Sequence, residues 1–270
     1  MTTTFAQVSD LHFGRHDPAT AAALRRDLAA ASPDVVIASG DLTQRARRAE
    51  FRAARAWLDS LALPWIAVPG NHDIPLFDVV RRFLAPLGRW RRYIGPDDEV
   101  FFGNAEVAIL GLDTARRNRW KEGRIRASQI DAARRAFAAT SPGTLRVLVT
   151  HHPFLPAPDD RRWTPMERGE EAMAALRDAG LDLLLSGHQH RAYSEDVTRH
   201  YEKVARTVIV AHAGTSTSTR IRGEPNTWNL FRYEASTLTL EVRTLDGDRF
   251  VATGRRVFRR EPAGWGTIAA

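Results

Sequence analysis

Residues 34–41 read Asp-Val-Val-Ile-Ala-Ser-Gly-Asp, a short apolar run that ends in a glycine and an aspartate. Such a run is typical of a buried parallel strand. A similar run stands at residues 65–73, Trp-Ile-Ala-Val-Pro-Gly-Asn-His-Asp, and apolar residues at helical spacing over 46–61 separate the two. The runs begin about thirty residues apart, the usual size of a βαβ unit. We therefore expect an α/β fold that contains a parallel sheet.

The rest of the chain extends this pattern. We expect a first strand over 5–9 and a helix over 18–31. The expected elements that follow are strands at 99–103, 107–112, 145–150 and 181–186 and helices at 127–139 and 167–179. From about residue 191 only strands are expected, at 191–197, 204–212, 227–234, 237–244 and 249–258. This layout predicts a pair of sheets covered by helices, with a largely antiparallel second half, in one domain over 1–270.

Composition restricts the chemistry that the chain can use. The 270 residues are 43% hydrophobic, enough for a substantial core. The chain contains no cysteine, which excludes disulfides, thiolate metal sites and cysteine nucleophiles. Any metal must therefore bind through oxygen and nitrogen atoms.

The formal charge of +7 favours anionic partners such as phosphates, nucleotides or lipid surfaces. The only lysines are Lys121 and Lys203, so the charge comes from arginine and is equally consistent with a solvated surface. The first five residues lack the charged start and apolar run of a signal peptide. We expect a cytoplasmic protein, with peripheral attachment to a membrane left open.

Metal-binding side chains follow five of the expected strands. The segments are Asp10-Leu11-His12, Gly40-Asp41, Gly70-Asn71-His72-Asp73, His151-His152 and Gly187-His188-Gln189-His190. Each alone has a structural explanation as a helix cap, a turn residue or a buried histidine. Together they converge, because the carboxyl ends of strands form the crevice of an open sheet. One carboxylate, several imidazoles and an amide are roughly what two divalent ions about 3.5–4 Å apart require.

The order of these segments resembles the calcineurin-like metallophosphoesterase superfamily from Asp10 to His190, with no departure from the ligand pattern. The Asp-Leu-His start, the His-His-Pro of 151–153 and the Gly-His-Gln-His of 187–190 are most similar to its class III cyclic-nucleotide phosphodiesterase branch. The resemblance implies a four-layer αββα sandwich of two mixed sheets flanked by helices. It also implies two divalent or mixed-valence transition-metal ions, such as manganese, iron, zinc or cobalt.

The resemblance also implies a role for each residue of the set. One metal would be bound by Asp10, His12 and His190, the other by Asn71, His151 and His188, with Asp41 bridging them. His72 would face the substrate without binding a metal and would stabilise or protonate the leaving oxygen. Asp73 would orient the His72 ring and raise its pKa.

Three further residues are candidate substrate contacts. His212 opens a small polar segment, 213–218, that we place near the crevice. Arg116 and Arg119 stand in a basic loop after a strand, and arginine suits bidentate phosphate recognition. A second basic stretch, 81–93, predicts either an amphipathic surface that binds anionic lipid or an acidic substrate, or an ordinary helix with Phe83, Leu84 and Leu87 inward.

Three functions remain open. The leading hypothesis is hydrolysis of a small phosphodiester or nucleotide by a metal-bridging hydroxide. The second is hydrolysis of a lipid-linked pyrophosphate or a phospholipid at a membrane surface, as in the related UDP-diacylglucosamine pyrophosphatases. The third is a non-catalytic scaffold, which the complete ligand set disfavours. No folded nucleic-acid-binding motif is recognisable, and a homodimer through the late strands is left open.

Overall fold

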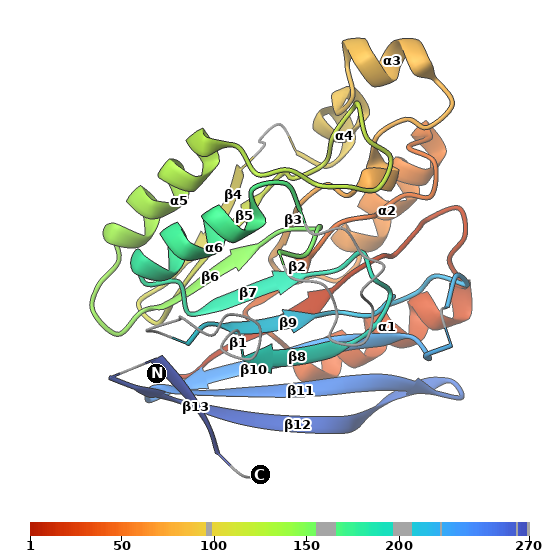
Figure 1. Ribbon diagram of the computed structural model, residues 1–270. Helices are drawn as coiled ribbons and strands as arrows, with labels where there is room; N and C mark the ends of the chain where they lie inside the picture. Colours follow the sequence, from red (N-terminus) through yellow and green to blue (C-terminus); the bar gives the residue numbers. More distant parts are fainter. Residues whose placement is uncertain (96–98, 155–165, 197–206, 222, 263, 269–270) are drawn as a thin grey trace.

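Two β-sheets lie face to face in the computed structural model, which describes residues 1–95, 99–154, 166–196, 207–221, 223–262 and 264–268 (Figure 1). The seven-stranded sheet has the order β13-β12-β11-β10-β1-β2-β3, and the six-stranded sheet has the order β4-β5-β6-β7-β9-β8. Both sheets are mixed. Strands β1, β2 and β3 are parallel, and so are β5, β6, β7 and β9, whereas β10 to β13 pair antiparallel.

The elements follow the expected order along the chain. The first sheet contains β1 (Thr3–Val8), β2 (Val35–Ala38), β3 (Trp65–Ala67), β10 (Thr227–Glu234), β11 (Thr237–Asp246), β12 (Arg249–Glu261) and β13 (Gly264–Ile268). The second contains β4 (Glu99–Gly103), β5 (Val107–Leu112), β6 (Leu145–Val149), β7 (Leu183–Ser186), β8 (Tyr193–Asp196) and β9 (Ile209–His212). The helices are α1 (Pro18–Ala31), α2 (Arg48–Asp59), α3 (Val79–Leu84), α4 (Gly88–Tyr93), α5 (Ala127–Ala138) and α6 (Gly169–Asp178).

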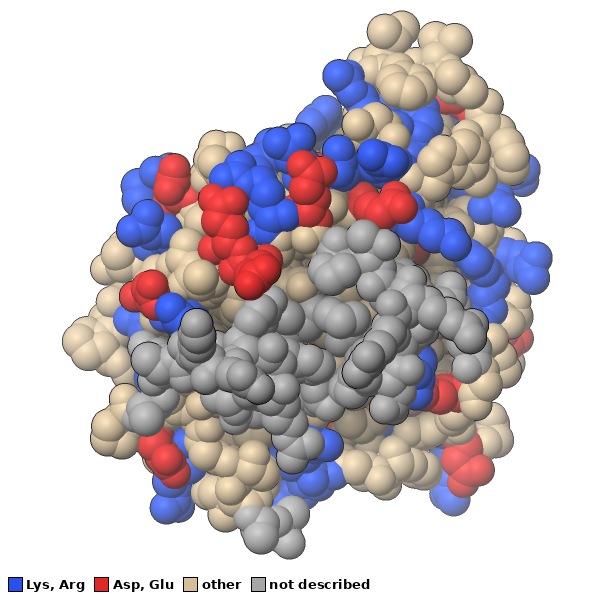
Figure 2. Space-filling view, in the orientation of Figure 1, with Lys and Arg blue, Asp and Glu red and all other residues tan. Residues whose placement is uncertain are grey.

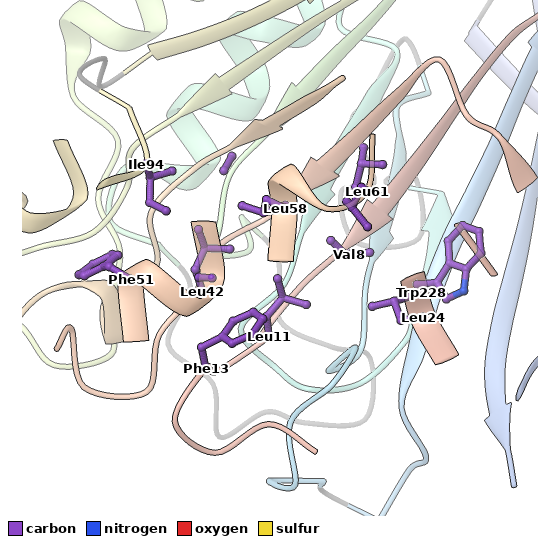
Figure 3. Packing of buried hydrophobic residues seen from close by; sticks show 14 of the residues in the cluster. Val8, Leu11, Phe13, Leu24, Leu42, Phe51, Leu58, Leu61, Ile94 and Trp228 are labelled. Carbon is purple, nitrogen blue, oxygen red and sulfur yellow. The ribbon is translucent and has the colours of Figure 1, made fainter. Parts of the chain in front are cut away.

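Three apolar clusters fill the spaces between four layers. One lies between the sheets and joins residues such as Phe5 and Ile37 to Val147. A second lies between the first sheet and α1 and α2, where Leu24 and Leu58 pack in the same cluster as Val8 (Figure 3). The third lies between the second sheet and α5 and α6. This arrangement confirms the predicted αββα sandwich with its antiparallel late strands.

Local sequence explains where the helices begin. Asp17 precedes α1 and its side chain accepts a hydrogen bond from the backbone N–H of Thr20 at 2.8 Å, while Pro18 occupies the first helical position. Helix α1 therefore has the bounds that the sequence predicts. No helix among the described residues is both long and apolar enough to cross a bilayer.

The stretch 81–93 differs from the single helix expected of it. It contains most of α3 and all of α4, which are separated around Pro86, a residue that cannot donate a helical hydrogen bond. Leu87 is buried as expected, but Phe83 and Leu84 are 46% and 81% exposed, so the expectation that they point inward was wrong. Strand β13 was also not predicted, and the start of the strand expected over 204–212 lies outside the described residues.

Candidate metal centre

The five polar segments meet at one edge of the sandwich. Three of them follow the parallel strands β1, β2 and β3 of the first sheet, and two follow β6 and β7 of the second. Hydrogen bonds hold this edge together: between the sheets, the backbone N–H of His188 donates to Asp10 Oδ2 at 3.0 Å, and within the second sheet, Gly187 N–H donates to the carbonyl of His151 at 3.1 Å. The crevice therefore draws its side chains from both sheets.

Asp10, His12, Asp41 and His190 form a first group of buried candidate ligands. One potential ligand atom from each lies within 4.8 Å of the others. His190 Nε2 is 3.1 Å from Asp10 Oδ1 and 3.4 Å from His12 Nε2. Atoms that bind one ion at about 2 Å in a tetrahedral site lie roughly 3–3.5 Å apart, so these spacings suit a shared ion. Asp10 Oδ1 is buried and accepts no hydrogen bond from the described residues, which leaves its lone pairs available to a cation.

Asn71, His151 and His188 form a second group beside the first. His151 Nε2 is 3.2 Å from Asn71 Oδ1 and 3.2 Å from His188 Nδ1. His152 also lies in this group, because it can place a ring nitrogen within 4.8 Å of His151 and His188. The sequence did not predict that, because side chains alternate along a strand; His152 comes after β6 has ended, where the alternation no longer applies.

Asp41 stands between the two groups. Its Oδ2 atom is 3.8 Å from His12 Nε2 and 3.4 Å from His151 Nε2, and its Oδ1 atom accepts a hydrogen bond from the backbone N–H of His72 at 2.8 Å. A carboxylate oxygen that faces both sets of imidazoles can contact two cations and offset part of their repulsion. This geometry supports the bridging role expected of Asp41, and the donor set as a whole fits two metal ions.

Backbone carbonyls orient three of the imidazoles. The Nδ1 atom lies 2.9 Å from the Ser39 carbonyl in His151, 3.0 Å from the Arg220 carbonyl in His190, and 3.4 Å from the Thr43 carbonyl in His12. A carbonyl can only accept, so Nδ1 carries the proton and Nε2 keeps a lone pair directed into the site. His188 differs, because it turns Nδ1 toward His151.

The backbone is strained where it supports the ligands. Positive φ angles occur at Asp10, His12, Asp41, His188 and His190, with values of 52°, 48°, 53°, 71° and 59°. Residues other than glycine seldom adopt this region, and such strain tends to gather at functional sites. The neighbouring glycines meet a different requirement: a Cβ atom at Gly70 would lie 2.2 Å from Asp41 Oδ1, and one at Gly187 would lie 1.9 Å from Ser9 Oγ.

Electrostatics keep both carboxylates ionised. Burial works to raise the pKa of Asp10, but His190 and His12 outweigh it and hold that pKa well below its usual value. Burial is likewise outweighed at Asp41, whose pKa is lowered by His151 and His72. Burial alone lowers the pKa of His151, yet Asp41 raises it to about 9, whereas burial and His151 lower the pKa of His188 to about 3. Metals bind ionised carboxylates and neutral imidazoles, so His188 is already in the binding form, whereas His151 has to release a proton when a metal binds.

His72 lies at the half-buried mouth of the site. Its Nδ1 atom is 2.9 Å from the carbonyl of Gln44 and 3.3 Å from the side-chain Nε2 of the same residue. Its Nε2 atom accepts a hydrogen bond from Arg220 Nη1 at 3.1 Å. Burial lowers the pKa of His72 despite the opposing effect of Asp41, which is opposite to the raised pKa that the sequence predicted.

The role expected of Asp73 requires correction. Its carboxylate accepts hydrogen bonds from the backbone N–H groups of Leu42, Thr43 and Gly70 and from the Thr43 hydroxyl, at 2.9–3.2 Å. Gln44, and not Asp73, holds Nδ1 of the His72 ring. Burial and the nearby Asp41 carboxylate raise the pKa of Asp73 to about 7. Asp73 therefore ties the loop after β2 to the loop after β3 and shapes the site through the backbone.

Gln44 and Arg220 are site residues that sequence reasoning did not select. Both stand in loops several residues beyond a strand end, so the pattern of polar strand tips does not include them. The one sequence hint was the segment 213–218, placed near the crevice. The structure brings it there: Thr215 Oγ1 donates to the Asp10 carbonyl at 2.8 Å, and Arg220 follows two residues after the segment.

The three expected substrate contacts occupy different environments. His212 is fully buried in β9, where Nδ1 lies 2.8 Å from Ser186 Oγ and the ring stacks on Tyr193 with centroids 4.1 Å apart. These contacts support a packing role, and a contact between His212 and substrate stays a prediction. Arg116 lines a cavity beside the site and pairs with Glu167, while Arg119 is exposed.

Comparison with known proteins agrees with this geometry. The model of the calcineurin-like phosphoesterase family matches residues 3–192. The chain is 30% identical over 203 residues to a probable cyclic nucleotide phosphodiesterase of Synechococcus sp., covering 72% of this chain and 75% of that protein. It is 31% identical over 177 residues to a cAMP/cGMP dual specificity phosphodiesterase of Mycobacterium tuberculosis, covering 62% of this chain but only 51% of the relative.

A solved structure extends the likeness to the fold. A dimetal phosphatase from Danio rerio superposes with a TM-score of 0.66 at 14% identity, covering 93% of this chain and 98% of the other. The chain therefore belongs to the calcineurin-like phosphoesterase family, a family of hydrolases, and the predicted resemblance is confirmed.

Proposed function

We propose that this protein is a metal-dependent phosphodiesterase that hydrolyses small phosphodiesters, cyclic nucleotides among them. The observation that carries the proposal is the position of Asp41 Oδ2, which faces His12 Nε2 and His151 Nε2 and so joins the two ligand groups into one binuclear site. The names of the two curated relatives support a phosphodiester substrate. Mixed nitrogen and oxygen ligands suit manganese, iron, zinc or cobalt.

The ions, when bound, would supply a hydroxide near neutral pH and hold the phosphoryl oxygens, so no covalent enzyme intermediate is required. His72 and Arg220 would contact the phosphate and the leaving oxygen. Nε2 of His72 and Nη1 of Arg220 lie together at the mouth of the site. A phosphoryl oxygen that enters this space accepts a hydrogen bond from Arg220 in place of His72. Once Arg220 has turned to the phosphoryl oxygen, Nε2 of His72 takes up a proton from solvent and donates it to the leaving oxygen, while the Gln44 carbonyl holds Nδ1.

The test is hydrolysis by metal-stripped enzyme that is resupplied singly with manganese, iron, zinc or magnesium. The substrates are bis-p-nitrophenyl phosphate, p-nitrophenyl phosphate and cyclic AMP, with His72→Ala as the variant. We expect metal-dependent cleavage of the diesters and a sharp loss of kcat in the variant. Absence of cleavage with every metal, together with a bound-metal content near zero, would overturn the proposal.

A second candidate function, hydrolysis of a lipid-linked substrate at a membrane surface, is favoured by one observation. Phe77, Val80 and Leu84 on and beside α3 are 72%, 70% and 81% exposed, and α3 projects from one corner of the molecule (Figure 1). We test this second function by sedimentation with vesicles of anionic phospholipid at low salt. The experiment compares the protein with a Val80→Ser, Leu84→Ser variant. Equal sedimentation of the two proteins would remove its support.

A further inference from the structure

A cavity of about 520 Å³ lies between α3–α4 and the loop before α5. Five of its lining residues are arginines and one is acidic. The charged residues that line it are Arg91, Arg116, Arg117, Arg124, Arg126 and Asp113. Figure 2 shows Lys and Arg side chains gathered over the same region, between α5 and the α3–α4 pair, with a few acidic side chains among them.

This cavity adjoins the candidate metal centre on two sides. Ile74, which lines it, directly follows the segment Asn71–Asp73. Asp113, on the other wall, precedes Thr114, whose Oγ1 atom lies 2.8 Å from Nδ1 of His152. The cavity therefore lies beside segments that contribute to the candidate metal centre.

An acidic side chain neutralises part of the positive charge around the cavity. Glu167, just outside, pairs with both Arg116 and Arg124, the latter at 3.4 Å. Arg117 donates from Nη1 to the carbonyl of Phe83 at 3.0 Å, a bond that fixes the side chain but does not cancel its charge. Helix α5 also begins at the cavity with no acidic residue in its first turn, which adds positive potential there.

Buried Arg82 holds the walls of the cavity in place. It is 5% exposed, and its guanidinium donates to the carbonyls of Pro75, Arg116 and Arg117 at 3.0, 3.3 and 2.7 Å, and also to the carbonyl of Arg119. These partners are neutral, so Arg82 brings a further cation close to the cavity. A loop fixed in this way presents its arginines without an ordering cost on binding.

A second cavity on the described surface provides a contrast. It measures about 450 Å³ and lies over α5 and α6, where Asp131 and Asp178 stand beside Arg134 and Arg135. Arg134 and Asp131 form an ion pair at 3.8 Å. Charges of both signs balance there, so an excess of cations distinguishes the cavity beside the metal centre.

We propose that the arginine cavity binds a second phosphate group, carried by the same substrate whose phosphodiester is cleaved at the metal centre. This inference rests on the proposed function and narrows its substrate class to phosphodiesters that also carry a phosphate monoester. Arginine forks match phosphate oxygens in a bidentate manner, and the volume is within the usual range for a small-molecule site. Arg117 and Arg126 are exposed at the cavity and contact the phosphate.

Two chromogenic substrates test the proposal. One is thymidine 5′-(p-nitrophenyl phosphate), and the other is the same compound with a 3′-phosphate. We expect kcat/KM for the 3′-phosphorylated compound to be about tenfold higher, mainly through a lower KM, since charge-assisted hydrogen bonds to phosphate have this magnitude. In an Arg117→Gln, Arg126→Gln variant the ratio of the two kcat/KM values falls close to one.

The control variant is Arg134→Gln, in the balanced cavity on α5, which retains the ratio of the unmodified enzyme. Equal cleavage of both compounds by the unmodified enzyme overturns this inference but leaves the phosphodiesterase proposal intact. Failure to cleave either compound or bis-p-nitrophenyl phosphate overturns both. If the cavity instead binds free phosphate, the two compounds are cleaved equally. Inorganic phosphate then changes the rate of the unmodified enzyme but not that of the double variant. That result also overturns the substrate assignment.

Discussion

Arg220 Nη1 donates to Nε2 of His72 across 3.1 Å, although 148 residues separate the two along the chain. The same arginine accepts a hydrogen bond at its carbonyl from Nδ1 of His190, a candidate ligand, at 3.0 Å. One residue therefore contacts the metal group through its backbone and the substrate-facing histidine through its side chain. A cation in that position neutralises charge on a bound phosphate and keeps the resting His72 ring unprotonated at Nε2.

Replacement of Arg220 separates these two contacts. In Arg220→Gln the backbone carbonyl still orients His190, so we expect metal content to stay the same. The lost cation should lower kcat/KM on bis-p-nitrophenyl phosphate about 10- to 100-fold, the range for hydrogen bonds to charged groups. Arg55→Gln, an exposed residue paired with Asp59 on α2, is the control and should change kcat/KM little. A metal content that falls in Arg220→Gln would show that its side chain supports the ligands instead.

Asp41→Asn should separate the two ligand groups electrostatically. A neutral amide cannot offset the repulsion between two close cations, so we expect bound metal to fall from two ions to one or fewer. Loss of partners of metal ligands costs roughly 10–100-fold in activity, and loss of a bridging ligand should exceed that range. Metal analysis and the rise of Tm on adding manganese are the measurements, with the exposed Asp59→Asn as control. Two ions retained with an unchanged Tm rise would contradict the bridging role.

Gly70→Ala tests whether position 70 requires a glycine only because Asp41 lies so close to it. The φ angle of Gly70 is −106°, which alanine adopts without strain, but the new Cβ would lie 2.2 Å from Asp41 Oδ1. We expect Asp41 to be displaced and metal-dependent activity to fall at least about tenfold, because a shift of roughly 1 Å in a reacting geometry can cost far more. Gly95→Ala, where a Cβ meets nothing within 4 Å, should behave as the unchanged protein. Equal activities of the two variants would contradict this account.

The αββα sandwich and the convergence of the metal ligands could both be predicted from the sequence, because both depend on short-range patterns. Apolar runs such as Val35–Ala38 specify buried strands, and the first polar residues after each parallel strand must lie at the same edge. Gln44 and Arg220 follow no such rule, since the path of a loop depends on packing that spacing along the chain does not encode. The role of Asp73 was predicted wrongly for a related reason. Its place beside His72 in the sequence suggested a contact with the His72 ring, but its carboxylate instead accepts hydrogen bonds from the backbone N–H groups of Thr43 and Gly70.

The basic stretch 81–93 shows a second limit. Its spacing favoured one helix with an apolar inner face, but Pro86 divides it and leaves Leu84 exposed. Among its cations, Arg82 is the buried one and Arg81 remains at the surface. Sequence periodicity could not distinguish these two neighbours, because the difference arises from the carbonyls of the loop 116–119, more than thirty residues away.

This pair of neighbours provides the last prediction. Arg82→Gln removes the donors of four backbone carbonyls, and unsatisfied partly buried acceptors cost about 1–3 kcal/mol, so the free energy of unfolding should fall by that amount. Arg81→Gln removes an exposed ion pair with Asp78 and should cost less than about 0.5 kcal/mol. Urea unfolding of the two variants measures both values. Equal stabilities would mean that water replaces the guanidinium of Arg82 and that the cavity walls do not depend on this side chain. A loss of stability in Arg82→Gln alone would show that Arg82 stabilises the loop 116–119, which carries arginines of the cavity.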